Sequence, residues 1–461
     1  MRSVKWIALA LSLILAACGG GTASTTTNPL VTNTMPTAPV PTAPGLEVEL
    51  QSCASPPVTF SPLCEIYELL ETWYVDAPVD AAALAEIAVR ALQEYESDVT
   101  EEPPRTLFCA IPHEAFAPMC DELAARVEDS SIAVGPAVEA AMAHMIDLGL
   151  DPFTYYLPPG QTGSIRLNGV VGGIGVLLDA RDAVGSKCGT VNETCRLEIV
   201  IVLEDNPGFA AGLVAGDVVT AVDGVPVDGR GFSAIVSQIA GDETGVVEIS
   251  VDRAGEQLTF QMERAELSVP TVEYGMPRDD VGYLRIPDFE FDVPALVADS
   301  LAEIMAEDPS VLVVDLRDNP GGYVDAFVEV ADEFVDGGVV MISDAPGEHL
   351  EYEALPGGAA TDPELIVLVN RGTASAAEVL AGALRDRRDA LVVGTDTFGK
   401  DAVQIPFTLR NGGEFHVAVA RWSTPDGETV GNGGLTPDAE VVWPAQATVE
   451  EITEIALNAL P

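Results

Sequence analysis

The chain is poor in positive charge. Its 461 residues include 73 aspartates and glutamates but only 22 lysines and arginines, which gives a formal net charge of −51. Proteins that bind nucleic acid through its phosphates need basic surfaces, so this balance argues against a nucleic-acid partner. The acidity is instead typical of a solvated surface suited to salty surroundings.

Lysine is especially scarce, because the whole chain contains only Lys5, Lys187 and Lys400. A surface charge can be supplied by arginine, which this chain uses almost everywhere else. Arginine cannot act as a catalytic base, because a guanidinium does not release its proton in a protein, whereas a desolvated ammonium can. Lys5 belongs to an N-terminal leader and Lys187 adjoins a cysteine loop, which leaves Lys400 as the candidate base.

Histidine and the common serine-hydrolase motifs are missing from the places where a hydrolase would need them. His113, His144, His349 and His416 lie in no recognisable triad context, and neither GDSGG nor G-x-S-x-G occurs. His113 lies within CAIPHEAFAPMC, but no cysteine pair has the several histidines nearby that a thiolate–imidazole metal site would need, so such a site is not expected. The sequence therefore predicts no metal and no cofactor.

The first 17 residues are those of an export signal. Arg2 and Lys5 precede an apolar run, Trp6 to Leu15, that is too short to span a bilayer. The run ends in Leu-Ala-Ala-Cys, which resembles the bacterial lipoprotein signal. The resemblance implies cleavage before Cys18 and lipidation of its thiol. We therefore expect an exported protein that is lipid-anchored at the cell envelope, on a membrane surface or in the periplasm.

Residues 18–48 are rich in Thr, Pro, Ala and Gly and show no hydrophobic period. This composition predicts a tether.

Six further cysteines remain, an even number in an exported protein. The segments CASPPVTFSPLC and CAIPHEAFAPMC share Cys, Ala, Pro, Phe, Pro and Cys at matching positions, which indicates two similar loops, each closed by its own disulfide. A metal site is the alternative, but it would need clustered thiolates with nearby histidines. The predicted pairs are Cys53–Cys64, Cys109–Cys120 and Cys188–Cys195.

The period of the apolar residues divides the chain into three parts. Residues 49–160 show three- and four-residue spacing, which predicts a helical N-terminal region with two disulfide loops. Residues 165–265 contain short β-type runs bounded by Gly and Asp. From 270 to 450, strands and helices alternate. The predicted fold class is a multi-domain α/β protein.

The middle part resembles a bacterial PDZ domain. The resemblance rests on GGIGV, on NPGFAAGLVAGDVVTAVDGVPV and on GVVEISVDR, which occur in the order found in such domains. It implies that the turn formed by Gly173, Ile174, Gly175 and Val176 binds the carboxylate of a peptide through backbone N–H groups. The strand that follows would then pair with the extended peptide.

Three pieces of the last part carry the candidate chemistry. DLRDNPGG ends a buried strand, VNRGTASAAE places Ser375 at the start of a helix, and TFGKDAVQ contains Lys400 and Gln404. A serine oxygen at a helix N-terminus gains from the helix dipole when it becomes anionic, but it still needs a base. A buried lysine is available for this role because desolvation disfavours its charged form.

Together with DPFTYYL and TPDGETVGNGGLTPD, these pieces resemble the carboxy-terminal processing peptidases, or tail-specific proteases, over roughly residues 65–445. This family consists of Ser–Lys proteases with an inserted PDZ domain. The resemblance implies that Ser375 is the nucleophile and Lys400 the general base, and that Gln404 orients Lys400. The backbone N–H groups around Gly321 and Gly322 would form the oxyanion hole.

Two acidic residues, Asp401 and Asp386, lie near the candidate site residues in the sequence. Asp401 stands where the family usually has Gly, and a carboxylate there would favour the charged lysine unless it points to the opposite face of a strand. Asp386 matches an acidic position of the family, but it lies about 16 Å along the helix axis from Ser375. We therefore predict a structural role for Asp386, as a partner for Arg385, Arg387 or Arg388.

The predicted function is that of an exported, lipid-anchored serine endopeptidase whose PDZ domain captures an extended C-terminal segment of a protein substrate. One alternative is a catalytically inactive relative that uses the PDZ groove as a binding scaffold. Another is an envelope lipoprotein in which the protease fold only tethers partners.

Overall fold

The computed structural model describes residues 47–95, 104, 106–130, 132–159, 165–166, 170–171, 173–182, 188, 190–203, 206–240, 245–265, 272–431, 433–444 and 447–460. The predicted signal peptide, its lipidation site Cys18 and residues 18–46 of the predicted tether lie outside these ranges. The first strand begins at Glu47, so Glu47 and Val48, which the sequence assigns to the tether, belong to a strand instead. Within the described ranges, no helix is both long and apolar enough to cross a membrane.

The N-terminal region consists of two successive units of the same design, each a strand, a 3-10 turn and two helices. The first contains β1 (Glu47–Ser52), η1 (Val58–Phe60), α1 (Ser61–Trp73) and α2 (Ala81–Glu94); the second contains β2 (Thr106–Ile111), η2 (Glu114–Phe116), α3 (Ala117–Ser130) and α4 (Val134–Gly149). Ser61 and Ala117, where α1 and α3 begin, are 56 positions apart, and so are Cys53 and Cys109. The region is therefore an internal repeat.

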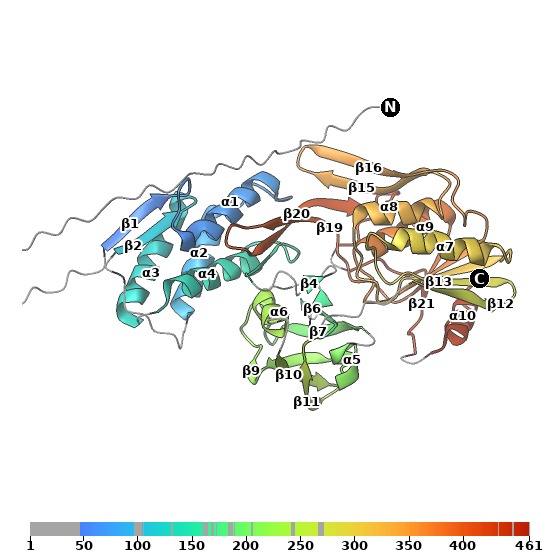
Figure 1. Cartoon of the computed structure of the whole chain (residues 1–461), viewed down its shortest axis with the longest axis horizontal. Coiled ribbons are helices and arrows are strands. Elements are labelled where there is room, and N and C mark those ends of the chain that lie inside the picture. The colour runs from blue at the N-terminus through green and yellow to red at the C-terminus, as the bar shows by residue number, and fades with distance from the viewer. Residues whose placement is uncertain are drawn as a thin grey trace, which may run out of the picture. The chain divides into compact units, whose positions relative to one another are not determined.

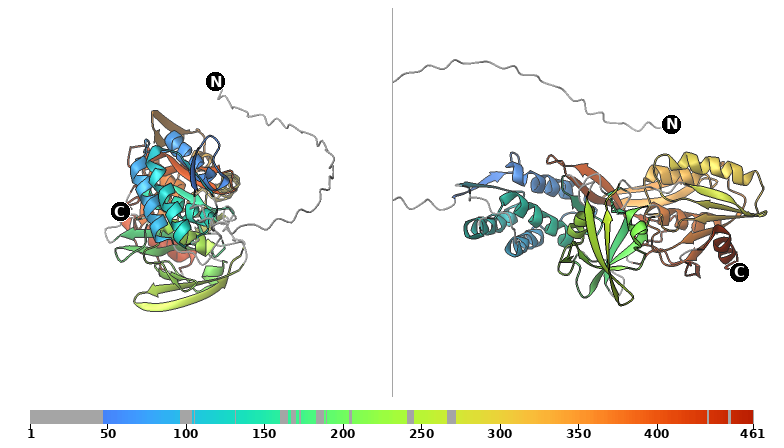
Figure 2. Two further views of the ribbon diagram at one scale, coloured as in Figure 1. Left: turned by 90° about the vertical axis from the view of Figure 1, so that its left-hand side faces the viewer. Right: turned by 60° about the horizontal axis from the view of Figure 1, so that its bottom comes forward.

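The strands β1 and β2 of the two units pair in parallel beside the four helices, as Figures 1 and 2 show. The apolar faces of the helices meet in one core that includes Phe60, Leu63, Phe116, Met119 and Leu123, all buried. The sequence predicts three of these helices correctly. It misses α3 and the strand pair, which the prediction of a helical region with two disulfide loops does not include.

The first two cysteine pairs occupy equivalent places in the two units. Their Cα atoms lie 5.5 Å apart for Cys53 and Cys64 and 6.1 Å apart for Cys109 and Cys120, within the usual range for a disulfide. The prediction of closed loops needs correction, because Cys109 lies within β2 and Cys120 within α3. Each bridge therefore ties the strand side of a unit to its first helix.

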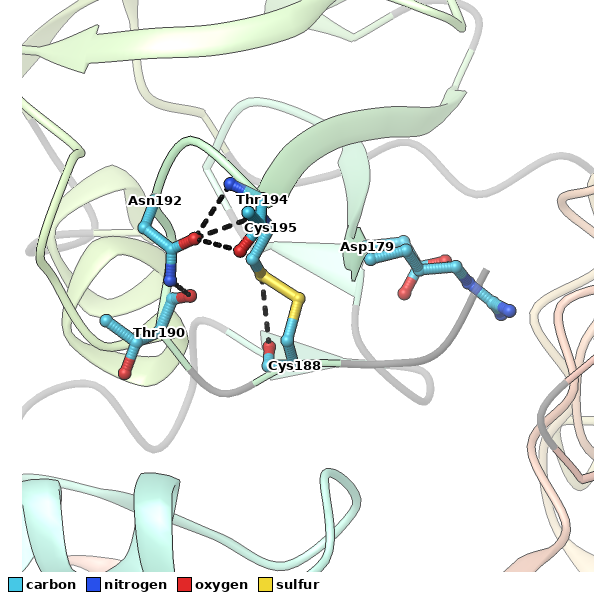
Figure 3. Close-up of a disulfide and its surroundings, with 7 residues drawn as sticks. Asp179, Cys188, Thr190, Asn192, Thr194 and Cys195 are labelled. Carbon is cyan, nitrogen blue, oxygen red and sulfur yellow. Dashed lines mark hydrogen bonds and ion pairs between the residues drawn. A yellow bond between two sulfur atoms is a disulfide. The ribbon is translucent and has the colours of Figure 1, made fainter. Parts of the chain in front are cut away.

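The third pair, Cys188 and Cys195, has its Cα atoms 6.2 Å apart at the start of a strand (Figure 3). The turn between them is held by Asn192, whose Oδ1 accepts hydrogen bonds from the Thr194 N–H at 2.9 Å and from the Cys195 N–H at 3.1 Å. All three pairs are in the predicted sequence order. Their oxidation in the mature protein stays a prediction.

Residues 165–265, here called the inserted β domain, form one antiparallel sheet of eight strands among the described residues, in the order β11-β10-β8-β7-β6-β5-β4 with β9 beside β8. Two short helices cover its buried Ile and Val side chains. The elements are β4 (Ile165–Arg166), β5 (Val170–Val171), β6 (Val176–Asp182), β7 (Cys195–Val202), α5 (Pro207–Ala211), β8 (Val218–Val222), β9 (Val225–Pro226), α6 (Phe232–Ala240), β10 (Val246–Arg253) and β11 (Glu256–Glu263).

The α/β core is built on a sheet that has six strands in the described part of the chain, in the order β12-β13-β14-β17-β18-β21. The elements are β12 (Glu273–Arg278), β13 (Val281–Arg285), α7 (Val293–Met305), β14 (Val311–Asp315), α8 (Val324–Asp332), β17 (Glu364–Val369), α9 (Ala376–Arg388), β18 (Leu391–Gly394), β21 (Ala439–Glu440) and α10 (Val449–Leu457). All neighbours from β13 onward are parallel.

Alternate side chains of these strands point to opposite faces of the sheet. Leu312 and Val314 of β14 join the core formed with α7, α8 and α9, whereas Val313 faces α10 on the other side. This explains why the strands are apolar without interruption, since parallel sheets are buried on both faces.

A second sheet of the core includes one strand from the N-terminal region. It contains β16 (Glu348–Ala354), β15 (Gly338–Ala345), β20 (Glu414–Ser423) and β19 (Ala402–Thr408), with β3 (Tyr155–Leu157) paired to β20. The predicted multi-domain α/β class is thereby confirmed.

Candidate active site

Ser375 lies on a sharp turn between β17 and α9, immediately before the first helical residue. Its backbone has φ 54° and ψ −123°, a conformation that non-glycine residues rarely adopt. Strained residues of this kind persist only where the surrounding structure holds them, and they gather at functional sites. The turn therefore presents the half-buried Ser375 to a cavity, as a nucleophile requires, although no G-x-S-x-G motif marks it in the sequence.

The glycine pair lies directly against this turn. A Cβ atom on Gly321 would come within 2.8 Å of both the Ala374 carbonyl oxygen and the Ser375 Cβ, and one on Gly322 would lie 2.4 Å from the Phe289 carbonyl oxygen. No side chain fits at either position. The glycines are thus required by the close approach of two backbone segments.

The structure shows which backbone N–H groups near the glycine pair are available as oxyanion donors. The Gly321 N–H donates a hydrogen bond to Asn319 Oδ1 at 2.8 Å, so it is already engaged. Gly322 lines the cavity beside Ser375, and so does Ala376. As the first residue of α9, Ala376 has an N–H without a partner inside the helix. The amides of Gly322 and Ala376 are therefore the better candidates for binding an oxyanion.

Lys400 lies in the loop before β19 and is only 4% exposed. Its backbone is held on both sides, because the Lys400 N–H donates to Glu378 Oε2 at 2.9 Å and the Lys400 carbonyl accepts from Trp422 Nε1 at 2.8 Å. Gln404 of β19 donates its amide N–H to the Phe153 carbonyl oxygen, in the segment DPFTYYL.

Ser375, Lys400 and Gln404 line one cavity with a volume of about 250 Å³. The cavity is walled by buried apolar side chains, including Phe327, Met341, Val379 and Trp422. Ser375 thus lies at the same cavity as Lys400 and Gln404, which follow it in the sequence by 25 and 29 residues. Their chemical roles remain a proposal.

Glu378 is a site residue that the sequence analysis misses. Its side chain is fully buried three residues after Ser375, and its two carboxyl oxygens accept four hydrogen bonds. The donors are the N–H groups of Ser375, Gly399 and Lys400 and the hydroxyl of Thr397. Burial raises the pKa of this carboxyl, and the four donors oppose the rise. Glu378 joins the nucleophile turn to the lysine loop.

The charge of Asp401 is paired away from the site. Its Oδ1 lies 3.1 Å from Arg421 Nη1, and a Cβ on Gly431 would lie 2.6 Å from Asp401 Oδ2. The carboxylate is therefore directed toward Arg421 and Gly431, which limits its influence on Lys400. Asp401 precedes β19 and is not part of the strand.

Asp386 has the structural surroundings that we predict. Its Oδ2 accepts a hydrogen bond from the Asp426 N–H at 3.0 Å, and its Oδ1 lies 3.9 Å from Arg385 Nε. It does not line the cavity.

The histidines offer no substitute for Lys400. His416 stacks on Tyr155 with ring centroids 4.5 Å apart and does not line the cavity. Burial and, to a lesser extent, the Lys400 charge lower its pKa to about 4. Across the described ranges, no three His, Cys, Asp or Glu side chains are grouped so as to hold a metal ion.

The predicted peptide-binding turn lies in the inserted β domain. Gly173 and Gly175 have φ values of 91° and 71°, and the carbonyls of Gly173, Ile174 and Gly175 accept hydrogen bonds at 2.8 Å from Ala265, Gly208 and Leu203. The turn is therefore fixed. Beyond it, Val176 and Leu177 of β6 pair with β5, so the first part of this strand edge is occupied by the chain itself.

Comparison with known proteins gives a consistent result. A family model described as Peptidase family S41 matches residues 280–441. A carboxy-terminal-processing protease of Bartonella bacilliformis (strain ATCC 35685 / KC583 / Herrer 020/F12,63) is 30% identical over 317 residues, which cover 67% of this chain and 70% of that protein. A probable CtpA-like serine protease of Staphylococcus haemolyticus (strain JCSC1435) is 29% identical over 323 residues, 69% of this chain and 62% of the relative.

The chain thus spans between three fifths and three quarters of the length of these relatives. Among solved structures, the photosystem II D1 C-terminal processing protease is similar with a TM-score of 0.62 and 24% identity, over 87% of this chain and 97% of that one. At this level of identity the likeness establishes the fold.

Proposed function

Because the chain belongs to the carboxy-terminal processing protease family, peptidase family S41, we propose that it is a serine endopeptidase with Ser375 as nucleophile and Lys400 as general base. The observation that carries the proposal is the convergence of Ser375, Lys400 and Gln404 on one apolar cavity beside the Gly322 amide.

In the proposed reaction, the Ser375 Oγ attacks the carbonyl carbon of the scissile peptide while the neutral Lys400 amine takes the hydroxyl proton. The N–H groups of Gly322 and Ala376 stabilise the oxyanion of the tetrahedral intermediate. The Lys400 ammonium then gives its proton to the leaving amine, which leaves an acyl ester on Ser375. A water molecule, deprotonated by Lys400, hydrolyses this ester and restores both residues.

Substrate capture is proposed for the inserted β domain, as a PDZ domain. The C-terminal carboxylate of a polypeptide would bind to the turn of Gly173 to Val176, and the preceding residues would pair with β6. Since β5 already pairs with Val176 and Leu177, the peptide would displace β5 or pair only from Leu178 onward. We further propose export and anchoring through lipid on Cys18, which would place the protein at a membrane surface.

The decisive experiment compares the purified mature protein with its Ser375→Ala variant on a denatured proteome, with cleavage sites identified by mass spectrometry. Hydrolysis should require Ser375 and should be unaffected by EDTA, because no metal takes part in the proposed steps. Cleavage that survives in Ser375→Ala, or that EDTA abolishes and zinc restores, would contradict the proposal. A wild-type protein that binds peptides without cleaving them would support the scaffold alternative.

The capture step has a separate test. Matched peptides that end in a free apolar carboxylate or in an amide should differ in kcat/KM, with the acid cleaved faster. Equal rates for the two would remove the carboxylate-binding role of the inserted β domain without affecting the assignment of Ser375.

A further inference from the structure

Two exposed aromatic rings stand at the mouth of the catalytic cavity. Phe291 is 69% exposed and Tyr323 is 47% exposed, yet their rings are stacked with centroids 4.0 Å apart and planes 20° apart. Both line the same cavity as Ser375. Single exposed apolar residues are common on proteins and need no explanation. A stacked pair that continues into an apolar cavity forms a contiguous apolar surface, and such surfaces mark binding sites.

The backbone at Tyr323 is fixed to that of Phe289, two residues before Phe291. The Tyr323 N–H donates to the Phe289 carbonyl at 2.9 Å, and the Phe289 N–H donates to the Gly321 carbonyl at 3.0 Å. Phe289 itself is fully buried and contacts Phe327 of α8 edge to face. The exposed rings are therefore held from beneath by a rigid support, which lowers the entropy cost of binding something against them.

The position of Tyr323 places this surface next to the scissile bond. It is the residue after Gly322, and consecutive Cα atoms are about 3.8 Å apart. An extended substrate advances about 3.3 Å per residue, so a side chain within about three positions of the cleaved bond can reach the rings. The deeper wall, with Phe327 and Met341, is also apolar and buried.

We infer that Phe291 and Tyr323 form a specificity subsite for a large apolar, preferably aromatic, side chain of the substrate close to the cleavage site. The inference rests on the proposed peptidase function and adds the substrate class. Offset stacking on an aromatic face adds to the gain from burial of the substrate side chain, so a Phe side chain should be preferred to Ala by about 10-fold to 100-fold in kcat/KM at that one position.

The test profiles the cleavage sites of the mature protein in a denatured proteome and then measures kcat/KM for two peptides that differ only by Phe or Ala at the selected position. Phe291→Ala, Tyr323→Ala and the double variant should each reduce the Phe-to-Ala ratio, the double variant to within about threefold of unity. Tyr323→Phe, which keeps the ring, should retain the ratio. Phe108→Ala is the matched control, because Phe108 is 45% exposed on β2 and does not line the cavity.

An unchanged ratio in the double variant would overturn the inference. So would a preference for Lys or Arg at this position that is lost in Asp325→Asn, since Asp325 also lines the cavity and a cation could sit on the rings. If the wild-type protein cleaves nothing, the proposed function fails by itself. The subsite is then judged by the binding of an extended Phe-containing peptide and its Phe→Ala counterpart to the Ser375→Ala protein, where equal affinity for the two peptides would refute it.

Discussion

At the scale of single residues, the chemical difference between lysine and arginine tests the proposed base. Lys400→Arg should lose nearly as much activity as Lys400→Ala, because arginine keeps the charge but cannot accept the Ser375 proton. General-base assistance contributes about 10²-fold to 10⁴-fold, so the loss should be plain in kcat for a peptide substrate. An arginine variant within a few-fold of the wild-type rate would contradict the Ser–Lys mechanism.

A second test asks whether Glu378 positions Ser375 and Lys400. In Glu378→Gln one carboxyl oxygen becomes an NH₂ group that faces donors, which breaks one or two hydrogen bonds to a charged acceptor at about 1.5–3 kcal/mol each. We expect a lower free energy of unfolding and a fall in kcat that exceeds any rise in KM, since Glu378 holds Ser375 and Lys400 but does not line the cavity. Glu307→Gln, at an exposed glutamate, is the control. An effect on KM alone would argue against positioning.

Asp288 predicts a pH dependence of stability. Burial raises the pKa of this carboxyl from its ordinary value of 3.8 to about 6, and it is only 3% exposed. Its contribution to stability is complete below pH 3.8 and is lost as the pH rises through 6. By linkage this loss is about 3 kcal/mol. Asp288→Asn should abolish that part of the decline.

The measurement is denaturant unfolding of both proteins at several values between pH 4 and pH 7.5. The difference in the free energy of unfolding, variant minus wild type, should grow across this range. A constant difference would show that Asp288 ionises as freely in the folded protein as in the unfolded one.

The site was predictable to the extent that residue type limits chemistry. Ser375, Lys400 and Gln404 could be found because few residues can act as nucleophile or base and because their motifs resemble a family. Glu378 had one local signal, the Ser-x-x-Glu capping pattern that it forms with Ser375. Its bonds to the Lys400 loop and the ring pair of Phe291 and Tyr323 could not be found, since they depend on contacts between segments far apart in the sequence. The hydrogen bond from the Gly321 N–H to the Asn319 side chain, two residues earlier, is a local contact that the sequence analysis also misses.

At the scale of secondary-structure elements, the cysteine bridges of the repeated units give a direct prediction. Mass mapping of the unreduced mature protein should find Cys53 joined to Cys64 and Cys109 to Cys120, with no free thiol. Each bridge closes a short loop. Replacing both cysteines of one bridge by serine should therefore lower the free energy of unfolding by about 2–3 kcal/mol in the loop-entropy model. A crossed pair, such as Cys53 with Cys120, would refute the equivalence of the two units.

Elements with a strong local signal were predicted well. The helices α1, α2 and α4 follow the three- and four-residue apolar spacing of residues 49–160, and the segments DLRDNPGG and VNRGTASAAE mark the end of β14 and the start of α9. The pairing of β1 with β2 could not be predicted, because Glu47–Ser52 and Thr106–Ile111 are far apart and each is short. Helix α3 was missed because its first turn, with Pro118 and Cys120, was assigned to the second disulfide loop.

At the scale of the whole molecule, the net charge of −51 should make stability depend on salt. Repulsion among acidic side chains opposes the compact state, and ions screen it over a Debye length of about 10 Å at 0.1 M. We expect the Tm to rise by several degrees between about 20 mM and 500 mM NaCl. Glucose at the same osmolarity serves as the control for non-ionic effects. A Tm that falls with NaCl would show that attractive ion pairs outweigh the repulsion.

The internal repeat of the N-terminal region also has an evolutionary meaning. Duplication of one ancestral segment accounts for two strand–turn–helix–helix units with bridges at matching places. A single ancestral unit would have presented its strand with no neighbour, and such an edge readily pairs with another chain. After duplication the second strand is supplied by the same polypeptide, at the high effective concentration of a tethered partner. An association between two molecules has in this way become part of the folding of one.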